Sequence, residues 1–261
     1  MKKFTVDEEV KQINLFDERF YQIGDIDLFN VTGWLEAFPK GNGFNQWLKT
    51  TKDPEAVRDE AAQLGSDVHK LIELTLHGEK IKWFNVNNID VWERYLGWCN
   101  FWKDLQDDPN KTLDIKKKIK SIDILPKLTE YIVYDFELET AGTVDKKIKV
   151  IYEDDSYEFV ILDWKSGNNI YDTAYIQVAT YMEIDFRMTQ DAVWRLLGRI
   201  VQVNPTLNKK GYRVYSVDIE DFEYFLTSKK NYIRAFKQPK PKYRTYPTEV
   251  DLENIQSTIL K

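Results

Sequence analysis

Two residue types that commonly bind transition metals are scarce in this sequence. Its 261 residues include one cysteine, Cys99, and two histidines, His69 and His77. A single thiol excludes an internal disulfide and any site built from several thiolates, such as an iron–sulphur cluster. Two imidazoles give little support to a zinc centre. We therefore expect any bound metal to be a hard cation held by oxygen atoms.

Long apolar runs are missing as well. The longest unbroken apolar stretches, such as 159–162, have about four residues, whereas about 18 are needed to span a bilayer. Residues 1–9 contain two lysines but no apolar run, and such a start is not that of a secretory or organellar leader. The sequence thus predicts a cytoplasmic protein without a membrane segment. With 43% hydrophobic and 31% charged residues the chain is expected to fold, which excludes the disordered and low-complexity classes.

Negative charge exceeds positive charge overall, but positive charge is concentrated towards the C-terminal end. The net charge is −6, yet residues 209–244 contain ten Lys or Arg against four Asp or Glu, a local charge of +6. This basic and aromatic stretch suits contact with a polyanion, and a solvated helix face followed by a basic tail explains it equally well. Tyr232 and Phe236, at helical spacing, fit the core better than base stacking. The candidate phosphate contacts are Lys229, Lys230, Arg234 and Lys237.

Hydrophobic periodicity predicts one domain over residues 1–261. Apolar residues at steps of three and four predict helices at 55–76, 89–105, 172–187 and 220–236. Runs of β-branched and aromatic residues predict strands at 131–134, 138–144, 147–152, 159–164, 195–203 and 212–219. This order implies an α/β or α+β fold with a mixed sheet. The expected parts are a mainly helical one at 1–110, a sheet core at 128–220, and a C-terminal helix and basic tail at 221–261.

Two strand ends carry the residues that indicate chemistry. The apolar strand 159–162 runs directly into Asp163-Trp164-Lys165, and the strand period of two puts Asp163 and Lys165 on one face. The apolar strand 141–144 ends at Asp145, and a hairpin between the two strands would set them side by side. Two carboxylates and an ammonium then converge. Taken singly, each motif also fits an aspartate that forms a turn or a simple ion pair between Asp163 and Lys165.

Two helices add polar residues at helical spacing. Gly65, His69 and Glu73 follow one another at steps of four along the first predicted helix. A glycine inside a helix costs about 1 kcal/mol relative to alanine, which indicates that another group approaches closely there. His69 fits either a ligand or a satisfied core residue. Gln177 and Tyr181, one turn apart on the third helix, suit hydrogen bonds to phosphate or backbone, or form the polar edge of an amphipathic helix.

In this order, the motifs resemble those of the PD-(D/E)XK nucleases, particularly the branch of the RecB nuclease domain and the mitochondrial genome maintenance exonuclease. The resemblance covers most of the chain, and five motifs in the right order make it specific. The motifs are 30–35 with Phe38-Pro39-Lys40 and Trp47, then 65–73, Glu130 leading to 141–145, Asp163-Trp164-Lys165, and Gln177 with Tyr181.

The resemblance implies a restriction-endonuclease-like core (αβββαβ), with a central mixed sheet flanked by helices and an added N-terminal helical region. It also implies a role for each matching residue. Asp145, Asp163 and the main-chain carbonyl of Trp164 would bind the metal, with His69 as a further ligand, and Lys165 would be the catalytic lysine. The supporting residues would be Glu130, Glu73, Gln177 and Tyr181. The four cysteines of the iron–sulphur relatives are absent, and so is the glycine loop of a helicase motor.

These residues lead us to expect a Mg²⁺-dependent deoxyribonuclease, with Mn²⁺ as the alternative metal because imidazole is a softer ligand. A carboxylate-bound cation offsets the charge that develops during phosphodiester hydrolysis. The leading hypothesis is an exonuclease that acts on single-stranded DNA ends in replication, repair or recombination, with proteins of those processes as partners. The alternatives are a restriction or Holliday-junction type of endonuclease and a nucleic-acid-binding subunit that has lost catalysis. RNA stays open as a substrate.

Overall fold

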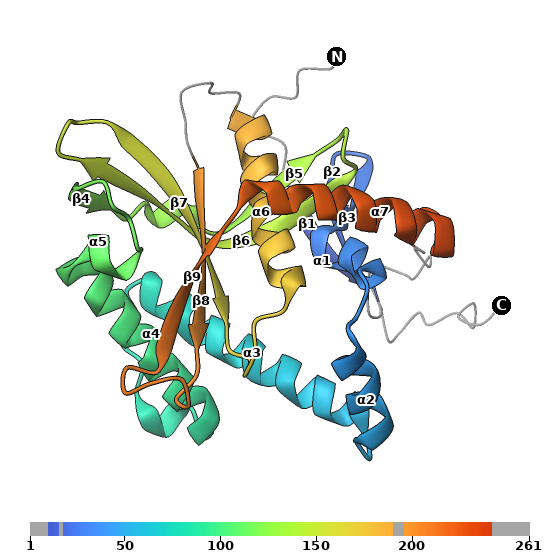
Figure 1. Ribbon diagram of the computed structural model, residues 1–261, viewed down its shortest axis with the longest axis horizontal. Coiled ribbons are helices and arrows are strands. Elements are labelled where there is room, and N and C mark those ends of the chain that lie inside the picture. Colours follow the sequence, from blue (N-terminus) through green and yellow to red (C-terminus); the bar gives the residue numbers. More distant parts are fainter. Residues whose placement is uncertain (1–9, 16–17, 190–195, 242–261) are drawn as a thin grey trace, which may run out of the picture.

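A nine-stranded mixed sheet forms the centre of the part of the chain that the computed structural model describes, residues 10–15, 18–189 and 196–241 (Figure 1). The strand order is β1-β2-β3-β6-β7-β8-β9, and β4 and β5 pair with β6. The β3–β6 and β7–β8 pairs are parallel, and the others are antiparallel. The strands are β1 (Val10–Leu15), β2 (Glu18–Ile23), β3 (Ile26–Asn30), β4 (Ile119–Asp123), β5 (Thr129–Asp135), β6 (Thr140–Tyr152), β7 (Tyr157–Lys165), β8 (Leu196–Val203) and β9 (Tyr212–Val217).

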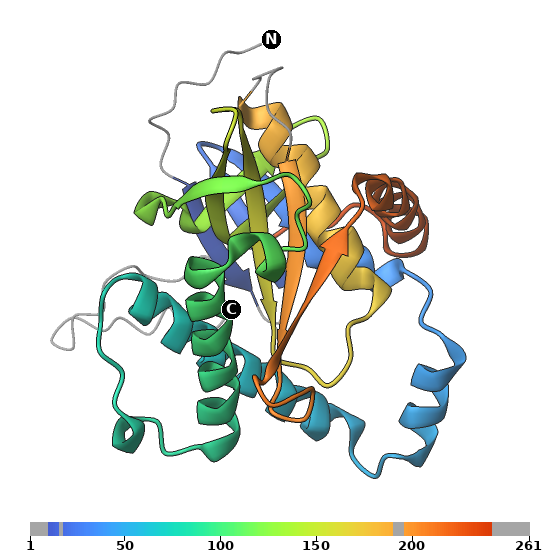
Figure 2. The same cartoon turned by 60° about the vertical axis from the view of Figure 1, so that its left-hand side comes forward.

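Helices cover both faces of this sheet, so the fold is α/β, as the sequence predicts (Figures 1 and 2). The helices are α1 (Val31–Trp34), α2 (Asn42–Thr50), α3 (Pro54–Leu76), α4 (Ile89–Asp107), α5 (Pro109–Thr112), α6 (Asp172–Thr189) and α7 (Phe222–Phe236), with short 3-10 turns at η1 (Leu35–Ala37), η2 (Trp83–Asn85), η3 (Pro126–Leu128) and η4 (Ile219–Asp221). Among the described residues, no helix is both long enough and apolar enough to cross a membrane.

Each face of the sheet packs on its own hydrophobic cluster. On one face α6 and α7 bury Val178, Phe225 and Tyr232 against the sheet. On the other face α3 and α4 bury Val68 and Trp98, among others, against β6, β7 and β8. Strand β8 serves both clusters because neighbouring side chains point to opposite faces. A sheet buried on both faces holds its strands in fixed positions, and the candidate site lies on β5, β6 and β7, where the β6–β7 ladder ends.

The four predicted helices are confirmed, each within a few residues of its predicted ends. The start of helix α3 contains residues that favour the first turn of a helix. Pro54 occupies the first turn, where its missing N–H costs nothing, and the Asp53 carboxylate accepts a 3.0 Å hydrogen bond from the amide of Ala56. The predicted strand 195–203 is confirmed from Leu196 onward, since residue 195 lies outside the described residues. Residues 242–261 of the predicted basic tail also lie outside them.

The strands differ from the expectation in two ways. Three strands that were not predicted, β1, β2 and β3, extend the sheet before the helices of the N-terminal part begin. Alternation failed as a signal in β2, where Phe20 and Tyr21 are both buried, one in each of two separate clusters. The predicted strands 138–144 and 147–152 are a single strand, β6. The charged run from Asp145 to Lys147 looked like a break, yet all of it is buried within the strand.

Both lysines of that run have polar partners on other segments. Lys146 donates hydrogen bonds to the carbonyl of Leu125 at 2.8 Å and to the Thr129 hydroxyl at 2.7 Å. Lys147 forms an ion pair with Asp185 of α6. Burial without a carboxylate partner lowers the pKa of Lys146 to about 8. These contacts allow β6 to continue through a stretch whose polarity predicts a break between two strands.

Candidate metal centre

Three carboxylates lie beside one another on three adjacent strands. The β5–β6 register pairs Thr129 with Lys146 and Tyr131 with Val144, which places Glu130 opposite Asp145. The β6–β7 ladder ends at the pair of Lys146 and Leu162, and the next position along sets Asp145 beside Asp163. The hairpin that joins β6 and β7 thus brings the two predicted strand ends together. The register adds Glu130, which the sequence motifs had given only a supporting role.

The Asp145 carboxylate connects the sheet to α3. Its Oδ2 accepts a 2.6 Å hydrogen bond from the main-chain amide of Trp164, at the point where the ladder between the strands ends. Its Oδ1 lies 3.6 Å from Nδ1 of His69. The Nε2 atom of His69 lies 3.0 Å from the carbonyl oxygen of Trp164. His69 therefore faces both the carboxylate and the main-chain carbonyl that were predicted as metal ligands.

Gly65 explains how α3 comes so close to β7. A Cβ atom at this position would lie 3.3 Å from Oγ of Ser166, which follows Lys165 directly. The continuous helix α3 therefore packs closely on the end of β7, as the glycine inside the helix indicated. The close approach places His69, one turn further along α3, over the end of β7.

The arrangement holds one compact group of ligand atoms and one ion pair. Single atoms of His69, Glu130 and Asp145 all lie within 4.8 Å of one another. The Asp163 carboxylate points instead to Lys165, whose Nζ lies 2.6 Å from its Oδ2. The structure thus brings together His69, Asp145 and the carbonyl of Trp164, and it places Asp163 with Lys165 at the edge of the same group.

Mutual repulsion and burial make this group electrostatically unfavourable without a cation. Burial, with Asp145 and Glu73 nearby, raises the pKa of Glu130 to about 8. Burial also raises the pKa of Asp163, although Lys165 partly offsets the shift. Burial opposes the charge on Lys165, but Asp163 and Asp145 outweigh it and raise the pKa of that ammonium. A divalent cation would remove the repulsion, and carboxylate, imidazole and carbonyl ligands fit Mg²⁺ or Mn²⁺.

The backbone at Glu130 is also strained. Its φ of +47° lies in the left-handed region, which a glutamate enters at a cost of about 1 kcal/mol or more. Strain of this kind persists where the surroundings fix a side chain for function. It supports a larger role for Glu130 than the sequence motifs assigned to it.

Replacing Glu130 by glutamine should stabilise the metal-free protein at high pH. Because the folded pKa lies above the ordinary value of 4.5, the unfolded chain loses this proton first, and the stability of the native protein falls as pH rises from about 4.5 to about 8. The neutral amide removes that loss. In chelator at pH 8.5, urea unfolding should show Glu130→Gln to be more stable than the native protein by on the order of 1–3 kcal/mol. A difference of the same size at pH 5 would contradict the raised pKa.

The predicted pair on α6 lies against the sheet beside the carboxylates. The Tyr181 ring covers Gly142 so closely that a Cβ there would lie 2.4 Å from it. Gln177 donates a 3.0 Å hydrogen bond from Nε2 to the Tyr181 hydroxyl. Burial raises the pKa of Tyr181 well above its ordinary value, and Tyr21, Asp145 and Asp163 add to the shift. The pair therefore borders the site, and burial keeps the Tyr181 phenol protonated.

The loop after Lys165 is fixed by residues that the sequence motifs did not single out. Arg94 of α4 donates from Nε to the carbonyl of Ser166 at 2.9 Å. Gln202 of β8 donates to the carbonyl of Gly167 at 2.8 Å, and it accepts a bond from the Tyr215 hydroxyl. A signal for Gln202 existed, since it is a polar residue between two valines in an apolar strand, and it is 1% exposed.

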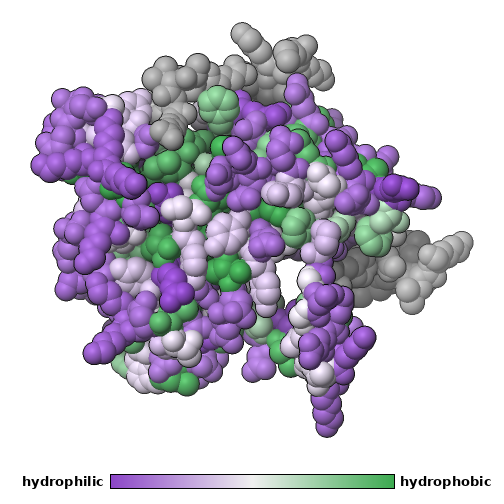
Figure 3. Space-filling model, in the orientation of Figure 1, coloured by the Kyte–Doolittle hydropathy of each residue, from purple (hydrophilic) through white to green (hydrophobic). Residues whose placement is uncertain are grey.

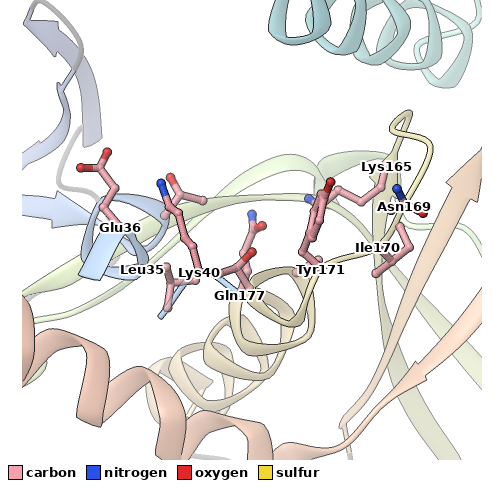
Figure 4. Close-up of a pocket in the computed structure, with 11 residues that line it drawn as sticks. Leu35, Glu36, Lys40, Lys165, Asn169, Ile170, Tyr171 and Gln177 are labelled. Atoms are coloured by element: carbon pink, nitrogen blue, oxygen red, sulfur yellow. The ribbon is translucent and has the colours of Figure 1, made fainter. Parts of the chain in front are cut away.

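A pocket opens beside this loop (Figure 4). It has a volume of about 290 Å³ and lies between residues 32–40 on one side and residues 165–177 on the other. Lys165 and Gln177 of the predicted site are among its lining residues. In the close-up, Lys165 and Tyr171 lie on the same side of the pocket, while Glu36 and Lys40 come from the opposite side. Lys165 therefore faces a space that a small molecule can enter.

The basic residues on α7 lie apart from the carboxylates. Lys230, Arg234 and Lys237 are exposed, and none of them forms an ion pair within the described residues. Lys229 differs, because its ammonium donates to the carbonyl of Leu138 at 2.6 Å and lies over the Trp34 ring. It is thus committed to contacts inside the fold. Tyr232 is buried and Phe236 is 66% exposed, so the expected core position holds for the first of these rings.

Comparison with models of known protein families gives no match to this sequence, and comparison with curated proteins gives none. The geometry described above and the order of the sequence motifs therefore carry the functional assignment.

Proposed function

We propose that this protein is a divalent-metal-dependent deoxyribonuclease of the PD-(D/E)XK type, acting in the cytoplasm as an exonuclease on single-stranded DNA ends. The observation that carries the proposal is the row of Glu130, Asp145 and Asp163 across three adjacent strands, with Lys165 and His69 against it. The proposed setting is replication, repair or recombination, with proteins of those processes as partners.

The order of elements supports the proposed restriction-endonuclease-like core. Helix α3 is followed, after α4 and α5, by β5, β6 and β7, then by α6 and β8. With the intervening β4 set aside, this is the αβββαβ order of that core. The carboxylates lie on its three consecutive strands, and the Gln177–Tyr181 pair lies on its second helix. The strands β1 to β3 and helix α2 are additions before it.

The side chains have distinct tasks in the proposed hydrolysis. Asp145, held by the amide of Trp164, and Glu130 and His69 beside it are the metal ligands, together with the Trp164 carbonyl and Asp163. A divalent cation bound there would supply Lewis-acid stabilisation of the phosphate and a bound water of lowered pKa. Lys165, held by Asp163, orients the attacking water or stabilises the charge that develops on the phosphate.

The surroundings of the pocket favour a single strand. Helix α2 buries none of its side chains, and Figure 3 shows an opening through the molecule beside it. Figure 1 places α2 below α1 and the start of α6, which line the pocket. Residues 40–52 contain three lysines and no acidic residue. A positive segment beside a narrow opening suits a flexible single strand that enters by its end, whereas a rigid duplex needs a wider groove.

Digestion of labelled DNA tests this function. Single-stranded and double-stranded oligonucleotides, labelled at the 5′ or the 3′ end, and a closed single-stranded circle would be incubated with the protein in Mg²⁺, Mn²⁺ or chelator. We expect stepwise shortening of the linear single strand, an intact circle, and no reaction in chelator. A cut circle would instead identify the endonuclease alternative. Absence of cleavage with tight DNA binding would favour the catalytically silent subunit, which the intact Asp145, Asp163 and Lys165 argue against.

Neutralising the exposed charges of α7 should weaken DNA binding without altering catalysis. The variant Lys230→Gln, Arg234→Gln, Lys237→Gln removes three cations that the fold leaves unpaired among the described residues. If all three contact phosphate, the slope of log affinity against log salt should fall by about 0.7 per lost contact on a single strand. Affinity measured by fluorescence anisotropy at several salt concentrations checks this, with chelator present to prevent cleavage.

A variant that loses three positive charges on another surface distinguishes direct phosphate contacts from general electrostatic attraction of DNA. Lys111, Lys116 and Lys127 are exposed and lie near β4 and α5, away from α7. Replacing these three by glutamine should leave the salt slope unchanged. An unchanged slope for the α7 variant, together with a reduced slope for this control, would move the DNA path to the region of Lys111 to Lys120.

A further inference from the structure

The pocket beside Lys165 has an apolar floor and an aromatic rim. Leu35, Ile170 and Ala174 contribute apolar side chains to it, and Tyr171 lies at its edge (Figure 4). The Tyr171 side chain is 69% exposed, so one face of its ring is open to a ligand. A volume of about 290 Å³ lies at the small end of the roughly 300–1,000 Å³ that ligand sites occupy, which limits the occupant to one nucleotide unit.

The position of Tyr171 is fixed by the structure around it. Its carbonyl accepts a 2.9 Å hydrogen bond from the amide of Ala174 at the start of α6. The loop that leads to it from Lys165 is held by Arg94 at Ser166, by Gln202 at Gly167, and by a 2.7 Å bond between Asn204 and Asn168. An exposed ring on a well-anchored loop loses little entropy when a ligand stacks on it.

The groups that line the pocket suit a base as its occupant. Glu36 contributes a carboxylate, and Lys40 and Lys165 contribute ammonium groups, so the lining carries charge of both signs. Lys40 stands on the same side, where its ammonium lies 4.6 Å from the centre of the Phe44 ring. Asn169 adds an amide that can donate to and accept from the edge of a base. Apolar floor, aromatic rim and mixed polar groups are the features of a site for a planar, neutral heterocycle.

We propose that this pocket holds the nucleobase next to the scissile phosphate, stacked on the ring of Tyr171. This inference rests on the proposed nuclease function, since Lys165 joins the pocket to the carboxylates. It assigns to Tyr171 the positioning of the substrate: the stacked base holds the neighbouring phosphate at the row of carboxylates. The site accepts any of the four bases, because stacking uses the face that all of them share.

A series of abasic oligonucleotides tests the contact directly. Single-turnover cleavage of an end-labelled single strand would be measured in saturating Mg²⁺, with one abasic site moved stepwise through the nucleotides nearest the reacting end. In the native protein, an abasic site at one position should slow cleavage by about tenfold, as expected for one lost stacking contact. Tyr171→Ala should slow cleavage of the intact strand by a similar factor, and the abasic site should cause no further loss in that variant. Tyr171→Phe should behave as the native protein does.

The controls distinguish a loss of base stacking in the pocket from a loss of the nuclease reaction itself. Tyr224, an exposed tyrosine on α7 outside the pocket, provides the matched variant Tyr224→Ala, which should cleave at the native rate. If the abasic site slows Tyr171→Ala as much as it slows the native protein, the base does not stack on Tyr171 and the inference is wrong. If the native protein does not cleave the intact strand, the nuclease proposal fails, and this inference fails with it.

Discussion

Replacing Lys165 by alanine should reduce the cleavage rate by about 10²–10³-fold and leave the affinity for DNA nearly unchanged. A preorganised cation is worth several kcal/mol when charge develops on the phosphate in a buried site. Lys165 fits this role, because it is held at 2.6 Å from Asp163 and its pKa stays above the ordinary value. Binding depends on many phosphate contacts, so the loss of one of them changes affinity little.

The comparison of rate with affinity is the test of this role. Single-turnover cleavage in saturating Mg²⁺ gives the rate, and anisotropy in chelator gives the affinity. Lys165→Arg keeps the charge but changes its geometry, and we expect it to recover only part of the rate. Lys118→Ala, at an exposed lysine paired with Glu153, is the control and should have the native rate. An affinity that falls as steeply as the rate would make Lys165 an anchor for DNA.

The part of the site carried by Asp145, Asp163 and Lys165 was predictable from sequence because its geometry is local. A strand period of two fixes Asp163 and Lys165 on one face, and a short hairpin between β6 and β7 fixes the neighbour of Asp163. Neither relation depends on contacts that are distant along the chain. His69 needed one more relation, the packing of α3 on the end of β7, which the glycine one turn before it indicated.

The position of Glu130 could not be predicted from local sequence patterns. Its place opposite Asp145 depends on the register between β5 and β6, and register follows from packing against the rest of the sheet. The sequence around Glu130 contains no pattern that sets this register. Its pKa, raised first by burial and then by the nearby carboxylates, and its positive φ are properties of the folded sheet.

The N-terminal strands were missed for a related physical reason. Sequence patterns identify strands by alternation, which requires one buried and one exposed face. Neighbouring residues of β2 are buried in different clusters, so alternation is lost. The charged run within β6 caused the opposite error, since a break was predicted where the strand continues. Each of its three charges has partners that lie far away in sequence or on other elements.

Replacing Asp145 by asparagine should abolish cleavage and stabilise the metal-free fold at the same time. The asparagine Oδ1 can still accept the hydrogen bond from the amide of Trp164, so the strand ends keep their arrangement. The lost charge removes the ligand at the centre of the row, and several kcal/mol of metal-dependent stabilisation correspond to a rate loss of more than about 10³-fold. It also relieves the repulsion that adds to burial in raising the pKa values of Glu130 and Asp163.

Thermal unfolding with and without Mn²⁺ measures both effects in one experiment. The native protein should gain stability on addition of the metal, because the metal binds the folded state and not the unfolded chain. Asp145→Asn should unfold at a higher temperature than the native protein in chelator and should gain little from Mn²⁺. Asp123→Asn, at an exposed aspartate of β4, is the control and should respond to Mn²⁺ as the native protein does. Cleavage by Asp145→Asn at the native rate would place the catalytic site elsewhere, whereas lower stability in chelator would show that the three carboxylates do not repel one another in the fold.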